Sequence, residues 1–171
     1  MLKAQKDFIH SAIAKDPEYN SSGFRMRKEI SEIDFDNYII FAGSSHTTGV
    51  GVKYEEMFSH LVSAVMKVDC VNLALGGGGI DAVEHNLLVW HLKYKQPPKA
   101  IVVEWPIYQR YIKHIEHQEN LCPAGNWSDP KFVTYADIPL YVKGEMVFKQ
   151  LHRLIPTKII DVTHGKISKY T

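Results

Sequence analysis

A serine hydroxyl, a carboxylate and an imidazole occur in this chain at positions that suit acyl-transfer chemistry. Ser45 lies in the segment GSSHTTG directly after the apolar run Tyr38–Ala42, and His164 follows Asp161 by three residues at the end of the segment KIIDVTH. Acyl transfer requires a nucleophile, a base that takes its proton and a group that orients the base. The pattern predicts Ser45 as the nucleophile, His164 as the general base and Asp161 as the residue that orients it.

The same residues also have a plain structural interpretation. A capping serine in a polar strand-to-helix loop has the same local sequence as Ser45. Asp161 fits an ordinary strand residue and His164 a surface turn equally well. The chemistry therefore depends on whether these residues meet in space.

Four consecutive glycines, Gly76–Gly79, follow the apolar run 68–75. Such a run costs backbone entropy on folding, so a left-handed conformation or a close approach of the backbone to a ligand must justify it. Acyl transfer also needs N–H donors for the oxyanion. We predict that the backbone N–H groups of Ser45 and Gly77 supply them.

Apolar runs and helical patterns alternate along the chain from residue 38 onward. Short apolar runs predict strands over residues 38–42, 68–75, 100–105 and 158–163. Helical spacing predicts helices over 2–14, 54–66, 80–92, 107–119 and 140–154, and residues 120–131 are predicted as a loop. In the helix over 54–66 one face carries Met57, Phe58, Leu61, Val62 and Val65. This alternation predicts an α/β fold with a parallel sheet and helices on both of its faces.

Every chemically suggestive group follows one of the predicted strands. In parallel sheets of this kind, ligands bind outside the carboxyl ends of the strands. The groups that follow the four strands in turn are Ser45 with His46, the glycines Gly76–Gly79, the segment Trp105–Arg110, and Asp161 with His164. We therefore expect four separate loops to converge on one edge of the sheet and to form a site there.

The length of the chain favours one domain, and its charge balance does not indicate a charged binding partner. The chain has 171 residues and 45% hydrophobic content, which is enough to bury a full core, so we expect residues 1–171 to form a single domain. Within this domain we expect residues 1–36 to form an N-terminal helix and an extended arm. A formal charge of +1, evenly spread, gives no basic face for nucleic acid. The chain has only two cysteines, Cys70 and Cys122, and Cys70 is in a predicted buried strand, so no disulfide framework is expected. Since no run approaches a bilayer span or an export signal, we expect a cytoplasmic protein with no membrane partner.

Neither a metal nor a nucleotide is expected. His114 and His117 lie three residues apart on the predicted helix 107–119, a spacing that can share a zinc ion, but no third ligand follows in pattern. The glycine run departs from the dinucleotide fingerprint because Asp81 occupies the third glycine position, and no Gly-Lys-Ser/Thr follows. The sequence thus predicts no cofactor.

Three sequence blocks resemble the SGNH/GDSL hydrolase family. They are NSSGFRMRKE, IIFAGSSHTTGVGV and VNLALGGGGIDAVEHNLL, and they match in order and spacing over roughly residues 19 to 110. The resemblance implies a flavodoxin-like three-layer α/β/α sandwich and ester hydrolysis by a serine nucleophile. It also implies that Ser45 is the nucleophile and an oxyanion donor, that Gly77, in VNLALGGGGIDAVEHNLL, is the family's oxyanion glycine, and that Asp161 and His164 are the family's Asp-x-x-His pair.

The chain departs from the family pattern at three blocks. Ser44 stands where the family has an aspartate before the nucleophile, and the third strand ends in Val103-Glu104-Trp105-Pro106 without the usual oxyanion asparagine. In a subset of relatives Trp and a downstream Arg occupy this region, which implies that Trp105 and Arg110 line the substrate pocket. Gly78 is also expected to bind substrate, and His46 is expected to be either structural or pocket-lining. Gly165 replaces a common proline after His164. KIIDVT also fits an earlier strand of the family, in which case Asp161 and His164 are coincidental.

The most specific hypothesis is a serine hydrolase that removes a small acyl group from an ester, with a carbohydrate O-acetyl ester as the candidate substrate. A catalytically inactive binding or assembly module of the same fold is the alternative, motivated by Ser44 and by the missing asparagine. A phosphate or nucleotide binder that uses Gly76–Gly79 is a weaker rival.

Overall fold

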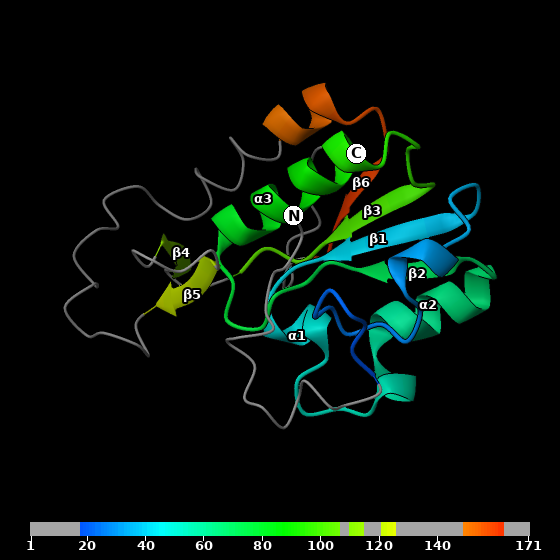
Figure 1. Ribbon diagram of the computed structural model, residues 1–171, viewed down its shortest axis with the longest axis horizontal. Helices are drawn as coiled ribbons and strands as arrows, with labels where there is room; N and C mark the ends of the chain where they lie inside the picture. Colours follow the sequence, from blue (N-terminus) through cyan, green and yellow to red (C-terminus); the bar gives the residue numbers. More distant parts are fainter. Residues whose placement is uncertain (1–17, 107–109, 115–120, 126–148, 163–171) are drawn as a thin grey trace.

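The computed structural model describes residues 18–106, 110–114, 121–125 and 149–162 (Figure 1). The predicted helix over 2–14, the early part of the predicted helix over 140–154, and His164 lie outside these residues. Among the described residues, no helix combines the length and the apolar run that crossing a bilayer requires.

A parallel sheet of four strands forms the centre of the fold. Its strands are β1 (Tyr38–Ala42), β2 (Asp69–Asn72), β3 (Ala100–Val103) and β6 (Ile159–Asp161), in the spatial order β2-β1-β3-β6. Ile39 pairs with Cys70 on one side and Ala100 on the other, and Val103 pairs with Asp161. This is the 2-1-3-4 order of flavodoxin-like sheets. The predicted α/β class with a parallel sheet is confirmed.

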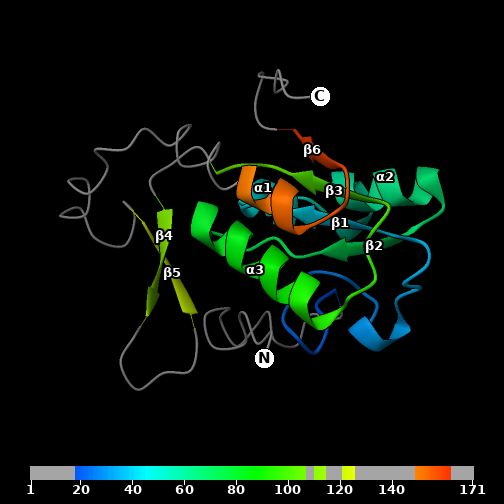
Figure 2. The same cartoon turned by 90° about the horizontal axis from the view of Figure 1, so that it is seen from above.

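Helices cover both faces of this sheet and complete three layers. On one face lie α3 (Ile80–Lys93) and a helical turn over residues 149–154, and on the other lies α2 (Phe58–Met66) (Figures 1 and 2). Right-handed crossovers require this split, since the chain moves from β1 to β2 in one direction and from β2 to β3 and β6 in the other. The layers therefore follow from the strand order.

All five residues of β1 are buried because the strand lies between the two helical layers. Successive side chains point to opposite faces of a sheet. Tyr38, Ile40 and Ala42 accordingly join the larger core on the α3 side, which includes Trp90 and Leu151. Ile39 and Phe41 join a smaller cluster on the α2 side. This explains why β1 is apolar throughout rather than alternating.

Helix α2 buries a different face from the one its sequence predicts. The structure has a 3-10 turn η3 (Tyr54–Glu56) and then α2, in which Ser59 and Ser63 are buried. Leu61, Val62 and Val65 are exposed to 50%, 40% and 82%. The small serines let the helix approach the sheet near Phe41 and Cys70, so the prediction that Leu61, Val62 and Val65 share a core face with Met57 is wrong.

A two-stranded hairpin replaces a predicted helix and loop. Residues 110–114 form β4 (Arg110–His114), which pairs antiparallel with β5 (Leu121–Gly125). The predictions of a helix over 107–119 and of a loop over 120–131 are therefore wrong at these positions. RYIKH contains aromatic and β-branched residues that suit a strand, and pairing with the following strand overrides a weak helical spacing.

The N-terminal arm packs beneath the sheet edge as a series of turns. Asn20 Oδ1 accepts hydrogen bonds from the backbone N–H groups of Ser22 and Phe24, which closes a tight turn at Gly23. Phe24 and Met26 are fully buried in the core on the α3 side. Arg25 lies between these two anchors, and its backbone forms a bridge with Tyr19. A 3-10 turn, η2 (Ile30–Glu32), then leads to β1.

Candidate functional site

The candidate site lies where the order of the strands reverses. β1 and β3 are neighbours, but the chain leaves β1 toward β2 on one side and reaches β3 on the other. In such sheets the usual ligand position is the region outside the carboxyl ends of the two strands at this reversal. Ser45 follows β1 by three residues and Glu104 follows β3 directly, so both lie in this region.

Ser45 is the first residue of a short helix, α1 (Ser45–Thr48), and is half-buried. The carbonyl of Ser44 accepts the N–H of Thr48 over 2.9 Å, which closes the turn of the helix. With the described part of the chain, neither the N–H nor the hydroxyl of Ser45 forms a hydrogen bond. Both groups therefore remain available for a substrate.

The carboxylate of Glu104 lies against the same turn. Its Oε2 accepts the backbone N–H of Ser44 at 3.1 Å and the hydroxyl of Thr47 at 3.0 Å. The Ser44 hydroxyl lies 3.3 Å from both carboxylate oxygens. The side chain of Glu104 is 6% exposed, and these donors compensate for its loss of water.

His46 pairs with the other oxygen of this carboxylate. His46 Nδ1 lies 3.5 Å from Glu104 Oε1, and the imidazole is 61% exposed. Glu104 therefore holds the exposed imidazole beside the turn, and the pocket-lining role of His46 stays a prediction.

The glycine loop after β2 lies beside the turn that contains Ser45. Leu75 donates its N–H to the carbonyl of Gly43 over 3.1 Å, which brings the two loops together. Gly77 has a φ of +78°, and a Cβ on Gly78 would lie 2.9 Å from the carbonyl oxygen of Leu75. The left-handed conformation expected for the glycine run is thus present at Gly77. The close approach at Gly78 is to the chain itself, and the expected approach to a ligand stays a prediction.

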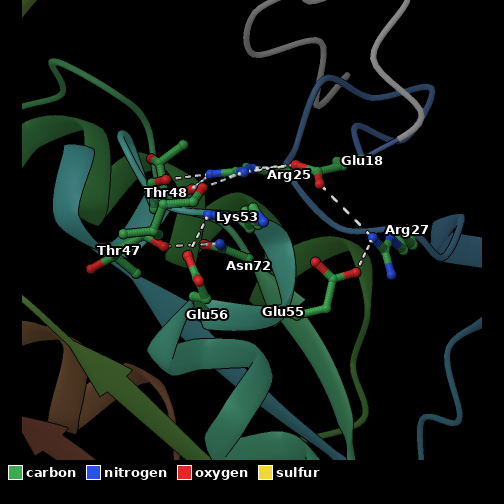
Figure 3. A network of polar contacts seen from close by, with 11 residues as sticks. Glu18, Arg25, Arg27, Thr47, Thr48, Lys53, Glu55, Glu56 and Asn72 are labelled. Carbon is green, nitrogen blue, oxygen red and sulfur yellow. Dashed lines mark hydrogen bonds and ion pairs between the residues drawn. The ribbon is translucent and has the colours of Figure 1, made fainter.

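Two further side chains hold the carboxyl end of α1 (Figure 3). Asn72, the last residue of β2, donates its Nδ2 to the carbonyl of Thr47 over 3.0 Å. Arg25 donates to the carbonyls of Thr48, Gly49 and Val52, the first and last at 3.3 and 2.9 Å. Its guanidinium also pairs with Glu18 at 2.7 Å and is 11% exposed. A cation at a helix carboxyl end complements the helix dipole.

The remaining predicted site residues have different positions. Asp161 ends β6 beside Val103 and is half-buried. Trp105 is 8% exposed and belongs to the core on the α3 side. Arg110 begins β4, and His164 lies outside the described residues. The pairing of Ser45 with Asp161 and His164, and the substrate contacts of Trp105 and Arg110, stay predictions.

Within residues 18–106 and the shorter described stretches, no three His, Cys, Asp or Glu side chains are grouped so that they could hold a metal ion. His114 lies in β4 rather than on a helix, and His117 is outside the described residues. The helical spacing on which the zinc interpretation depended is therefore not formed at His114.

Sequence reasoning missed Glu104, Asn72 and Arg25 as parts of the site. Arg25 and Asn72 lie in the first and third of the sequence blocks quoted above, but the sequence around each does not indicate which residue its side chain contacts. Glu104 had a signal: an acidic residue directly after a buried apolar strand must be compensated, and Ser44 stands where an acid is usual. The compensating donors became visible only once β1 and β3 were neighbours.

Comparison with known proteins finds a partial structural similarity to an SGNH-hydrolase family esterase. No family model and no curated protein matches this chain. Among solved structures, AlinE4, an SGNH-hydrolase family esterase, is similar with a TM-score of 0.36 and 17% sequence identity. The match covers 40% of this chain and 40% of that one, so the chain spans less than half the length of the esterase it resembles.

Proposed function

We propose that this chain is a serine ester hydrolase with Ser45 as its nucleophile. The observation that carries the proposal is the placement of Ser45: it begins a helix at the strand-order reversal, and its hydroxyl and N–H are both unengaged by the described chain. An engaged hydroxyl would have to break a hydrogen bond before attack. An unengaged N–H in the first turn of a helix favours developing negative charge.

In the proposed reaction, Ser45 Oγ bonds to the acyl carbon while its proton passes to His164, which Asp161 orients. The carbonyl oxygen becomes an oxyanion held by the N–H groups of Ser45 and Gly77. The C–O bond to the alcohol then breaks, and the alcohol leaves with the proton from the imidazole. Water attacks the acyl-serine in the same way and releases the acid, which regenerates the free hydroxyl.

The proposed substrate is an ester of a small acyl group, such as an O-acetyl group on a carbohydrate. The left-handed Gly77 supports this choice, because a backbone without side chains leaves the space beside the oxyanion donors to the substrate. The resemblance of the three sequence blocks to SGNH hydrolases supports the reaction class.

Labelling with a fluorophosphonate probe tests the nucleophile. The expected result is a covalent adduct on the peptide that contains Ser45, lost in Ser45→Ala and kept in Ser31→Ala, which changes an exposed serine of the N-terminal arm. Hydrolysis of p-nitrophenyl acetate should follow the same order. His164→Ala and Asp161→Asn should slow both reactions, and unchanged rates in these two variants would assign the base elsewhere.

A catalytically inactive binding module remains the second candidate. The observation that favours it is the end of β3, where Val103 is followed by Glu104 and no amide side chain is available as an oxyanion donor. A carboxylate there also opposes a nearby negative charge. A folded protein that forms no adduct at Ser45 would favour this module over the hydrolase.

A further inference from the structure

The carboxylate of Glu104 is enclosed by one short segment of the chain. Residues 43–47 wrap around it: Ser44 supplies its N–H and hydroxyl, Thr47 its hydroxyl and His46 its imidazole. None of these groups belongs to Ser45, which lies between them in the sequence and is left with its N–H and hydroxyl unengaged by the described chain.

The space inside this segment is filled by the carboxylate and by Thr47. A Cβ on Gly43 would lie 2.3 Å from Thr47 Oγ1 and 2.8 Å from Glu104 Oε2. Gly43 is therefore a glycine because the turn closes tightly on the carboxylate, and not because of its own backbone angles. The turn and the carboxylate determine each other's position.

The group that holds the turn is a buried carboxylate, since the side chain of Glu104 is 6% exposed. A buried carboxylate is costly unless donors surround it, so any movement of the turn that removes a donor is opposed. Hydrogen bonds to an ionised acceptor are about twice as strong as neutral ones. Since Ser44 has no side-chain hydrogen bond that caps its own helix, the side chain is free to serve Glu104 instead.

We propose that Glu104 is the positioning residue of the Ser45 turn, a proposal that rests on the hydrolase function for its catalytic consequence. Glu104 binds Ser44, His46 and Thr47, and this fixes the turn with the hydroxyl and N–H of Ser45 unengaged by the described chain. The carboxylate directly follows β3, so it reaches the turn from the strand next to β1. Glu104 itself does not react with substrate.

Two isosteric changes test this role. Glu104→Gln keeps the volume but replaces one acceptor oxygen by an NH₂ group that faces donors. Thr47→Val removes one donor to the carboxylate, while Thr47→Ser keeps the hydroxyl and is its conservative rescue. Val71→Ala, in the core of β2 and fully buried, is the matched control for lost stability away from the turn.

The first measurement is the rate of fluorophosphonate labelling and of ester hydrolysis, at a temperature where all variants are folded. We expect Glu104→Gln to lower kcat by about 10- to 100-fold with little change in KM, because a misplaced nucleophile slows the chemical step rather than binding. Thr47→Val should lower it less, and Thr47→Ser and Val71→Ala should stay near the wild-type rate. A purely structural Glu104 would slow Glu104→Gln no more than Val71→Ala.

The second measurement, amide hydrogen exchange, does not depend on activity. Exchange in peptides that cover residues 43–48 should become faster in Glu104→Gln and Thr47→Val, while exchange in β1 and α3 should not. Unchanged exchange at residues 43–48 overturns the positioning role whatever the activity. If the wild type reacts with the probe and Glu104→Gln reacts equally fast, the positioning role of Glu104 is overturned while the proposed hydrolase function stands. An unreactive wild type with faster exchange in both variants overturns the hydrolase and retains Glu104 as the anchor of the turn. Should Glu104→Gln not fold, the Thr47 pair decides.

Discussion

Arg25 Nη2 donates to the carbonyl oxygen of Val52 over 2.9 Å. This hydrogen bond joins the N-terminal arm to the loop that follows the Ser45 helix, and the same guanidinium also binds the carbonyls of Thr48 and Gly49. Phe24 and Met26, buried on either side of Arg25, fix the arm to the core. The turn is therefore held at one end by Glu104 from β3 and at the other by a residue that precedes the sheet in the sequence.

Arg25→Ala should destabilise the fold by about 2–4 kcal/mol, because two part-buried carbonyls and one exposed carbonyl lose a charged donor and Glu18 loses its contact with Arg25. Arg27→Ala is the matched control, since Arg27 also faces Glu18, at 3.8 Å, but its side chain is 49% exposed. The control should shift the unfolding midpoint little, because exposed ion pairs contribute little. Urea unfolding followed by circular dichroism measures both. Equal losses in the two variants would show that the carbonyl contacts of Arg25 do not stabilise the loop.

Gly43→Ala should destabilise the protein by about 1–3 kcal/mol, the usual range for a group forced into packed space. The new Cβ would meet Thr47 Oγ1 at 2.3 Å and the Glu104 carbonyl oxygen at 2.9 Å. Gly76→Ala is the control: there the Cβ has only Val50 Cγ2 within reach, at 4.0 Å, so stability should stay within about 1 kcal/mol of wild type. Thermal unfolding compares the two. A neutral Gly43→Ala would contradict the tight closure of the turn on Glu104.

Because α2 buries its serines and exposes its apolar side chains, a polar substitution on the exposed face and an apolar one on the buried face should have opposite costs from those that the sequence pattern suggests. Val65→Ser, at an 82% exposed apolar position, should change stability by less than about 0.5 kcal/mol. Ser63→Val, at a position that is 4% exposed, adds volume between the helix and the sheet and should cost about 1–3 kcal/mol. Chemical denaturation of both variants checks the assignment. The opposite order would show that α2 buries the face its hydrophobic pattern suggests.

Cys70 should behave as a protected thiol, because burial raises its pKa from 9.0 to about 11. In a Cys122→Ser background, alkylation by iodoacetamide at pH 8.5 should be slow in the folded protein and fast after unfolding.

The raised pKa of Cys70 also fixes the direction of a pH effect. Between about pH 9 and 11 the folded thiol keeps its proton while the unfolded thiol loses it, so this contribution to stability is full below pH 9 and is lost as the pH rises toward 11. Cys70→Ala should remove that part of the loss, as measured by urea unfolding at pH 8, 9, 10 and 11. An identical pH profile in both proteins would show that the thiol titrates normally.

The α/β class, the four parallel strands and the serine turn after β1 could be predicted because each depends on a local pattern. An apolar run such as Tyr38–Ala42 predicts a buried strand, and Gly43 with Ser44 predicts the turn that follows it. The glycine run after β2 likewise predicted a left-handed residue, which is Gly77. The assignment of α3 agreed to within one residue, since its helical pattern is long and ends before prolines.

Only the tertiary structure decided which carboxylate lies under the serine turn, which face of α2 is buried, and that residues 110–114 pair with residues 121–125. Two of these depend on a neighbour that is remote in sequence: β3 beside β1 brings Glu104 to Ser44, and the sheet selects Ser59 and Ser63 over Leu61 and Val65. The third depends on pairing with the next strand along the chain, β5, which a helical spacing in one segment does not reveal. Hydrophobic periodicity is a property of one segment, but burial and hydrogen bonding belong to pairs of segments. Their free energy is defined only after the chain has chosen which elements are adjacent.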